Sequence, residues 1–116
     1  LLENGPASPF IDWFLVRRFP LQAYDTRRKP NYEAWWNLAA LPKFNTDNAE
    51  ARDYLMRVGE YWAGRGIDGW RLDVPEEIRT EDFWEEFRER TRAVNPDLYI
   101  VGEIWHESKR WISPTM

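Results

Sequence analysis

The sequence has no cysteine, a single histidine and no apolar run long enough to cross a membrane. Without cysteine the chain forms neither a disulfide framework nor a thiolate metal site, and the redox compartment stays undecided. A membrane-spanning helix needs about 18 or more consecutive apolar residues, so we expect no membrane partner. The first residues lack the basic and apolar regions of a secretion signal, which slightly favours the cytoplasm over export. Because the chain starts with Leu1 instead of methionine, we expect a piece of a longer protein, whose localisation stays open.

Positive charge is also scarce, because 16 lysine and arginine residues stand against 20 aspartate and glutamate residues. The basic residues gather only in short clusters, at 17–18 and 27–29. Such clusters do not form the positive stripe that a phosphate backbone requires. We therefore expect no nucleic-acid partner.

Tryptophan, in contrast, is abundant, with eight residues. A flat indole suits the face of C–H groups that a pyranose ring presents, but tryptophan is equally a bulky core residue. The tryptophans therefore hint at sugar binding without establishing it.

Near residue 46 the chain divides into two regions that differ in proline content and in hydrophobic periodicity. Residues 1–46 contain most of the prolines and no sustained helical or strand period, and such a long irregular stretch is usually functional. The remainder predicts regular elements: a helix that Asn48 caps and Gly64 ends, a strand over 69–74, a helix that starts at Thr80 and ends at Asn95-Pro96, and a fully buried strand over 98–102. Helical and strand spacing place the side chains of Trp62, Trp70, Trp84 and Val94 on faces that we expect to be buried.

This order of helix, strand, helix and strand predicts parallel strands joined by a right-handed crossover. Asp73 and Glu103, which follow the two strands, are 30 residues apart. A (β/α)₈ barrel of about 250 residues gives each of its eight units about that length. The strands of a doubly wound open sheet are separated by a similar number of residues. However, no G-x-G-x-x-G follows either strand, so nothing in the sequence supports a dinucleotide-binding fold. We therefore expect an α/β fold with about two units of a barrel.

Acidic side chains follow both strands, at the edge where α/β enzymes place their active sites. Period-two alternation puts Arg71 and Asp73 on one face of the first strand, and the second strand brings Glu103 to the same edge. Neighbouring strands lie about 4.8 Å apart, and carboxyl groups about 5 to 5.5 Å apart are typical of retaining glycosidases. If the strands are neighbours, Asp73 and Glu103 are candidates for a catalytic pair.

The two acids differ in their expected surroundings. Arg71 would keep Asp73 ionised, as a nucleophile requires. Glu103 has no adjacent cation in the sequence and faces the charge of Asp73, so it would retain a proton and act as general acid. The alternative is a structural ion pair between Arg71 and Asp73, with Asp73 helping to start the next turn.

Three motifs add a family resemblance: residues 66–74 read GIDGWRLDV, residues 99–106 read YIVGEIWH and residues 41–45 read LPKFN. The first two resemble the nucleophile strand and the acid/base strand of the α-amylase family (glycoside hydrolase family 13). The third is similar to an element of the neopullulanase, cyclomaltodextrinase and maltogenic amylase group. This resemblance implies Asp73 as nucleophile, Glu103 as acid/base and Arg71 as part of the substrate-binding site.

The resemblance also implies the architecture and the activity. Residues 1–46 would be the distal part of domain B, an insertion after strand three of a (β/α)₈ TIM barrel. Residues 47–116 would be part of that catalytic barrel, about strands four and five with their flanking helices. The parent protein would be a glycosidase that hydrolyses α-1,4 or α-1,6 bonds in α-glucans such as maltodextrins, cyclodextrins or pullulan. The family's third carboxylate would lie outside the chain, so this piece alone would be inactive.

Other residues near the motifs are further candidates for the site. Glu77 matches the D-V-A-N-E that often follows the nucleophile strand in the group, although Glu76 replaces its amide, so we expect Glu77 to bind substrate. Trp105 would either stack on a sugar or pack under its loop. The single histidine, His106, is more often a hydrogen-bonding residue than a ligand. No loop has calcium-binding spacing, so we expect neither a metal nor a cofactor.

Two other functions compete with hydrolysis. A relative that transfers the glycosyl unit or isomerises a disaccharide would use the same two acids. A non-catalytic carbohydrate-binding member of the fold would be expected to lack one of them. The presence of both Asp73 and Glu103 favours an enzyme, and the oligomeric state stays open.

Overall fold

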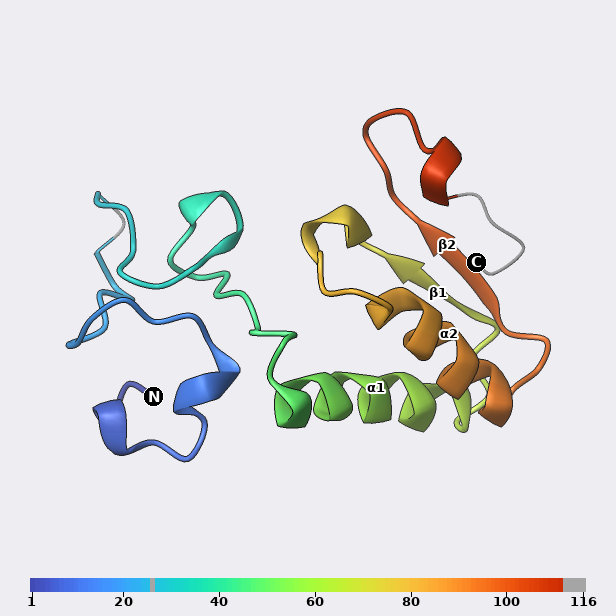
Figure 1. Cartoon of the computed structure of the whole chain (residues 1–116), viewed down its shortest axis with the longest axis horizontal. Helices are drawn as coiled ribbons and strands as arrows, with labels where there is room; N and C mark the ends of the chain where they lie inside the picture. Colours follow the sequence, from blue (N-terminus) through green and yellow to red (C-terminus); the bar gives the residue numbers. More distant parts are fainter. Residues whose placement is uncertain (26, 112–116) are drawn as a thin grey trace. The chain divides into compact units, whose positions relative to one another are not determined.

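The chain folds as two compact units, Leu1–Ala51 and Arg52–Met116. The computed structural model describes residues 1–25 and 27–111 (Figure 1). Within these residues, the helices are too short or too polar to span a bilayer.

The Leu1–Ala51 unit is mostly irregular, as its proline-rich sequence predicts. It contains short 3-10 helices and isolated antiparallel bridges. The helices are η1 (Gly5–Ala7), η2 (Ile11–Trp13) and η3 (Trp35–Asn37). The bridges join Phe14 to Phe44, Val16 to Tyr32 and Ala34 to Pro42.

The motif at residues 41–45 packs against an earlier segment of this unit, at residues 12–14. The ring of Phe44 stacks on Phe14, with 5.0 Å between the ring centroids. The backbone N–H of Asn45 donates to the carbonyl of Trp13 at 2.7 Å, and its side-chain amide donates to a second carbonyl of the same segment at 3.0 Å. Since an irregular chain must still pair its backbone polar groups, these bonds give the motif a structural role.

The second unit contains the elements expected of a parallel strand–helix–strand unit. In chain order they are α1 (Ala49–Ala63, which begins in the first unit), β1 (Gly69–Leu72), η4 (Pro75–Glu77), α2 (Phe83–Val94), β2 (Tyr99–Gly102) and η5 (Lys109–Trp111). At the start of α1, the side chain of Asn48 accepts the N–H of Ala51 at 3.0 Å, so the predicted cap is confirmed. Strands β1 and β2 pair in parallel, with Leu72 opposite Gly102. The prediction of adjacent parallel strands is therefore confirmed.

The core of this unit lies between the sheet and the two helices. Its buried members are Met56, Leu72, Phe83 and Phe87, with Trp70 and Trp84 among the partly buried residues packed against them. Helices α1 and α2 come close at Gly59, where an added Cβ would lie 2.5 Å from the Phe87 ring. The side chains predicted to be buried at Trp70 and Trp84 therefore do contribute to the core.

Several predicted boundaries were wrong. Strand β1 ends at Leu72 instead of residue 74, because Val74 adopts a left-handed conformation with φ 43°. Helix α2 begins at Phe83 and not just after Thr80, because Asp82 is also left-handed, with φ 56°. A left-handed residue interrupts both strand and helix geometry.

Two predictions of burial were also wrong. Trp62 and Val94 are 47% and 46% exposed. Strand β2 begins at Tyr99 and alternates exposed and half-buried residues, whereas the sequence predicted a fully buried strand. For β2 the physical reason is that the described residues form a sheet of only two strands, with a single layer of helices packed against it.

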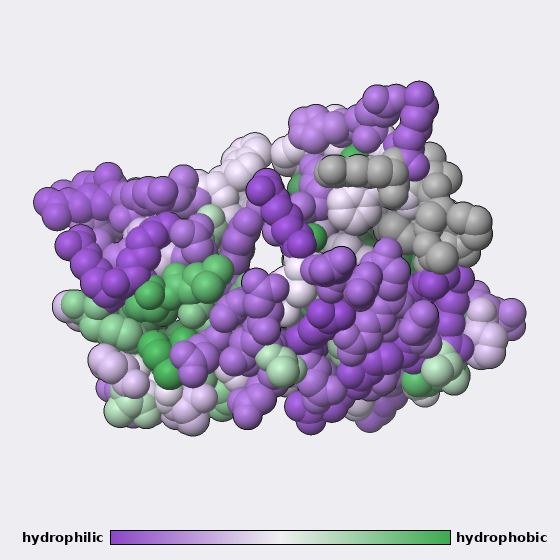
Figure 2. Space-filling model, viewed as in Figure 1, coloured by the Kyte–Doolittle hydropathy of each residue, from purple (hydrophilic) through white to green (hydrophobic). Residues whose placement is uncertain are grey.

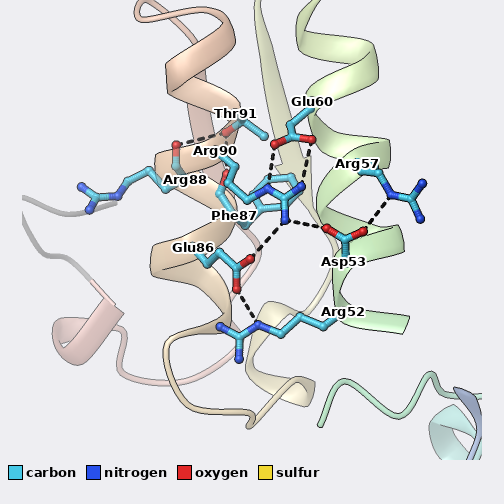
Figure 3. A network of polar contacts seen from close by, with 9 residues as sticks. All are labelled: Arg52, Asp53, Arg57, Glu60, Glu86, Phe87, Arg88, Arg90 and Thr91. Carbon is cyan, nitrogen blue, oxygen red and sulfur yellow. Dashed lines mark hydrogen bonds and ion pairs between the residues drawn. The ribbon is translucent and has the colours of Figure 1, made fainter. Parts of the chain in front are cut away.

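Charged side chains join α1 to α2 (Figure 3). The guanidinium of Arg90 donates to both carboxylate oxygens of Glu60, at 2.6 and 3.1 Å. It also donates to Asp53 at 2.9 Å and to Glu86 at 3.3 Å. The hydrogen bonds to Glu60 are the main reason why the pKa of Arg90 is raised above its ordinary value. These contacts lie in the largely hydrophilic surface that Figure 2 shows over the two helices.

This network predicts a specific pH dependence of stability. The hydrogen bond from Arg90 lowers the pKa of Asp53 below its ordinary value of 3.8. A lowered folded-state pKa stabilises the fold above the unfolded-state value, and the gain disappears as the pH falls through the folded-state value. In the full-length protein that contains this segment, the midpoint of thermal unfolding should therefore be higher for the wild type than for Asp53→Asn above pH 4. This difference in midpoint should shrink as the solution becomes more acidic.

The matched control is Asp97→Asn, which removes an exposed carboxylate after α2. We expect its midpoint to follow that of the wild type across the same pH series. A difference between wild type and Asp53→Asn that stays constant or grows in acid would contradict the prediction.

Candidate active site

Asp73 and Glu103 come directly after β1 and β2. The backbone N–H of Glu103 donates to the carbonyl of Leu72 at 2.9 Å, so the ladder between the strands continues to this point. Leu72 and Gly102 are paired and end their strands, and the residue that follows each of them is an acid. The structure thus brings the two predicted acids together at the carboxyl edge of the sheet, where α/β enzymes have their active sites.

Arg71 connects the two acids. Its Nη1 lies 2.6 Å from Oδ1 of Asp73, and its Nη2 lies 2.6 Å from Oε2 of Glu103. One guanidinium therefore binds one oxygen of each carboxylate, an arrangement that suits its planar fork of donors. The predicted contact between Arg71 and Asp73 is therefore present, whereas a role of Arg71 in the substrate-binding site stays a prediction.

Glu103 has no adjacent cation in the sequence, but the structure places one beside it, the guanidinium of Arg71. The cation comes from the neighbouring strand, and adjacency in the sequence does not reveal such a contact. The signal that could have revealed it was the register, because parallel neighbours with Arg71 opposite Val101 place Glu103 within reach of a long side chain.

Exposure argues against a purely structural role for this cluster. The side chains of Arg71 and Asp73 are 55% and 70% exposed, and that of Glu103 is 37% exposed. Ion pairs between exposed side chains typically contribute only about 0 to 1 kcal/mol to stability. A structural ion pair, the alternative interpretation of the sequence, would thus gain little here, whereas the exposed oxygens remain accessible to a ligand.

The loop after Asp73 has a strained backbone. Val74 is buried and has φ 43° and ψ 56°, a conformation that is rare for a β-branched residue. Such strain costs on the order of 1 to 3 kcal/mol and tends to occur at functional sites. Sequence reasoning missed it, because a residue before proline is normally biased toward extended backbone.

The same loop packs closely against the end of β2. A Cβ added to Gly102 would lie 3.0 Å from Cγ of Pro75, the first residue of η4. The residues that follow Asp73 are therefore in contact with the residue that precedes Glu103. This contact restricts how far the two acids can separate.

The other predicted site residues lie on loops at the same edge. Glu77 is half-buried in η4, and Trp105 is exposed in the loop after β2. Their predicted roles in binding substrate stay predictions. Nε2 of His106 lies 4.0 Å from Oε1 of Glu76, so the loops after the two strands also approach each other there.

A metal-binding cluster is absent from residues 1–25 and 27–111, which contain no group of three or more candidate ligands of the His, Cys, Asp and Glu types. The positive charge between the two acids is the guanidinium of Arg71.

Residues 11–115 match the family model described as the catalytic domain of α-amylase. The chain belongs to the α-amylase family. Family membership agrees with the site geometry, in which two acids and an arginine meet at the ends of parallel strands. It also confirms the resemblance that the motifs around Asp73 and Glu103 indicated.

Proteins similar to this chain act on glucans according to their names. The chain is 46% identical over 113 residues to the maltogenic α-amylase of Bacillus acidopullulyticus, covering 97% of this chain and 19% of that protein. It is 47% identical to the cyclomaltodextrinase of Geobacillus thermopakistaniensis, covering 97% of this chain and 18% of that protein. The chain thus spans about a fifth of the length of these relatives.

A solved structure supports the fold assignment. The native debranching enzyme of Nostoc punctiforme is 54% identical to the chain and superposes with a TM-score of 0.93. The match covers 98% of this chain and 24% of that structure. The fold is therefore that of the α-amylase catalytic domain, of which the chain represents a part of the length.

Proposed function

We propose that this α-amylase-family chain contains the reactive centre of a retaining glycoside hydrolase that acts on α-glucans. Asp73 is the nucleophile and Glu103 the general acid/base. The observation that carries this proposal is Arg71, which holds both carboxylates at the ends of adjacent parallel strands. The spacing of neighbouring strands, about 4.8 Å, suits the short separation of carboxyl groups in a retaining mechanism.

The reaction takes two steps. A carboxylate oxygen of Asp73 attacks the anomeric carbon while the glycosidic C–O bond breaks and Glu103 gives its proton to the leaving oxygen. Water then attacks the anomeric carbon of the glycosyl-enzyme. Glu103 takes the proton of this water, and the bond to Asp73 breaks.

The contact between Arg71 and Glu103 indicates which oxygen of Glu103 acts as the acid. Oε2 of Glu103 forms an ion pair with the guanidinium, which has no acceptor capacity. A carboxyl that protonates the glycosidic oxygen must donate, so its proton lies on the other oxygen, Oε1. The contacts of Arg71 with Asp73 and Glu103 can then persist and orient both acids.

The proposal includes the finer architecture. We assign β1 and β2 to the fourth and fifth strands of a (β/α)₈ barrel, with residues 47–116 as part of that barrel, although residues 112–116 lie outside those described. Residues 1–46 belong to the distal part of an inserted domain B. The irregular backbone of the Leu1–Ala51 unit supports this assignment.

The proposed substrates follow from the relatives. A maltogenic amylase, a cyclomaltodextrinase and a debranching enzyme are all similar to this chain. We therefore propose α-1,4-linked or α-1,6-linked glucans such as maltodextrins, cyclodextrins or pullulan, with Glu77 and Trp105 among the residues that bind them. Their positions on the loops after β1 and β2 support this role.

The stereochemistry of the first product tests the mechanism. In the full-length protein that contains this segment, hydrolysis of maltotriose should release a product whose new reducing end is initially in the α configuration, because two displacements restore the original configuration. Proton NMR during the first minutes, before mutarotation, distinguishes the anomers. Initial release of the β anomer would rule out a covalent intermediate on Asp73.

A further inference from the structure

The chain on either side of Asp73 contacts the end of β2. The carbonyl of Leu72, just before Asp73, accepts the backbone N–H of Glu103 at 2.9 Å. Beyond Asp73, the ring of Pro75 lies close to Gly102, where an added Cβ would meet Cγ of Pro75 at 3.0 Å. Asp73 therefore lies between two contacts with the end of β2. Its position relative to Glu103 depends on both, and the second contact depends on what holds Pro75.

A side chain of α2 holds Pro75 from the side of the helix. Nε1 of Trp84 donates to the carbonyl of Pro75 at 2.9 Å. The same carbonyl accepts the backbone N–H of Ile78 at 3.1 Å, at the end of η4. Because Pro75 is fully buried, these two donors take the place of water around its carbonyl. The loop after β1 is thus tied to α2 by one indole N–H.

The indole of Trp84 is itself firmly placed. Its ring packs edge-to-face on the rings of Phe83 and Phe87, with 4.9 and 5.6 Å between the centroids. Both phenylalanines are buried members of the core, and edge-to-face contact is a favoured arrangement of aromatic rings. The N–H that reaches Pro75 is therefore a donor fixed by the core and carried on a regular helix.

The loop needs such a tie because its backbone is strained. Val74, between Asp73 and Pro75, is left-handed with φ 43° and ψ 56°. A residue before proline normally prefers extended backbone, and a strained conformation persists only where the surrounding contacts enforce it. The hydrogen bond from Trp84 acts on the residue directly after Val74. Without this bond the loop should relax, and the side chain of Asp73 should turn with it.

We propose that Trp84 is a positioning residue for the reaction, which holds Asp73 and Glu103 in their relative places through Pro75. The indole N–H fixes the carbonyl of Pro75, and the proline ring is in contact with Gly102, the residue before Glu103. A displacement of about 1 Å at a reacting group can cost about 100-fold in rate. This role of Trp84 rests on the proposed function of the two acids.

Trp84→Phe in the full-length protein tests this role, because phenylalanine keeps an aromatic ring in the core and removes the N–H. The carbonyl of Pro75 keeps its bond from Ile78, so the fold should persist with a lower thermal midpoint. We expect kcat for maltotriose to fall about tenfold while KM changes less than about twofold, since the lost interaction places reacting groups and does not bind sugar. The rates are measured well below the lower of the two midpoints.

Thr91→Val is the matched control on the same helix. It removes a buried hydroxyl that donates to the carbonyl of Phe87 at 2.8 Å, a bond within α2 that does not reach the loop. Its midpoint should also fall, while kcat should stay that of the wild type. An unchanged kcat in Trp84→Phe, a loss confined to KM, or an equal loss of kcat in Thr91→Val would each overturn the positioning role.

Gly102→Ala tests the same contact from β2 and does so even if Trp84→Phe fails to fold. The added Cβ would displace the ring of Pro75, so kcat should fall in this variant as well. In the double variant the two losses should combine to less than their product, because both act on Pro75. A normal kcat in Gly102→Ala, or fully multiplicative losses, would contradict the proposal.

The wild type distinguishes this inference from the proposed function. If the wild type does not hydrolyse maltotriose, the proposed function fails and the role of Trp84 fails with it. If the wild type and Trp84→Phe hydrolyse it with the same kcat, only the role of Trp84 is refuted.

Discussion

Replacing Asp73 by asparagine in the full-length protein should lower kcat for maltooligosaccharides by at least about 10⁴-fold. The amide has nearly the shape of the carboxylate and can still accept a hydrogen bond from Arg71, but it is too weak a nucleophile to attack the anomeric carbon. The loss should therefore fall on kcat, with little change in the thermal midpoint. Initial rates of maltotriose hydrolysis and a melting curve measure the two quantities.

A matched control is Asp68→Asn. Asp68 is exposed just before β1, at the opposite end of the same strand, and only its backbone carbonyl takes part in the sheet. The same chemical change there should leave kcat close to that of the wild type. Near-normal turnover by Asp73→Asn would refute its assignment as nucleophile.

The second large effect is expected from Glu103→Gln. Loss of a general acid/base typically costs about 10²- to 10⁴-fold, and here the cost should depend on the leaving group. With maltotriose, the leaving sugar needs a proton, so formation of the glycosyl-enzyme should be slow. With α-maltosyl fluoride, the leaving group needs none. That first step should then stay fast, and the covalent intermediate on Asp73 should accumulate because water is no longer activated.

Rapid-quench mass spectrometry of the intact protein detects this intermediate as an added maltosyl mass. Glu107→Gln provides the control, because Glu107 lies in the loop after β2 and is exposed beside Lys109. That variant should hydrolyse both substrates normally. If Glu103→Gln slowed formation of the glycosyl-enzyme equally from maltotriose and from α-maltosyl fluoride, the acid/base role would be excluded and Glu103 would be left with a binding role.

Much of the second unit follows from local signals in the sequence. The cap at Asn48 and the glycine at position 66, with φ 85°, define the two ends of α1 and its following turn. Asn95 ends α2 as the sequence predicts. Alternation along β1 correctly separates Leu72, which is buried, from Arg71 and Asp73, which are exposed. These features depend on residues close together in the chain, so the sequence contains the information directly.

The remaining features depend on contacts between distant residues or on the rest of the fold. The left-handed backbone at Val74 opposes the usual preference of a residue before proline, and it occurs where the loop packs against Gly102. The pairing of Arg71 with Glu103 requires the register of two strands. The exposure of Tyr99 on β2 depends on which layers cover the described two-stranded sheet, which hydrophobic periodicity cannot report.

The link that Arg71 makes between Asp73 and Glu103 has a consequence for how such enzymes diversify. All three side chains belong to a single stretch of chain from β1 to the residue that follows β2, and α2 is the only long element between them within that described stretch. Two of the acids of the proposed bond-breaking apparatus, together with the arginine that links them, are therefore inherited as one contiguous cassette. Recombination or insertion elsewhere in the chain can alter which sugars are admitted while this cassette passes on intact. An exchange point between residues 74 and 98 would instead combine strands of different ancestry, and it would break the apparatus at its centre.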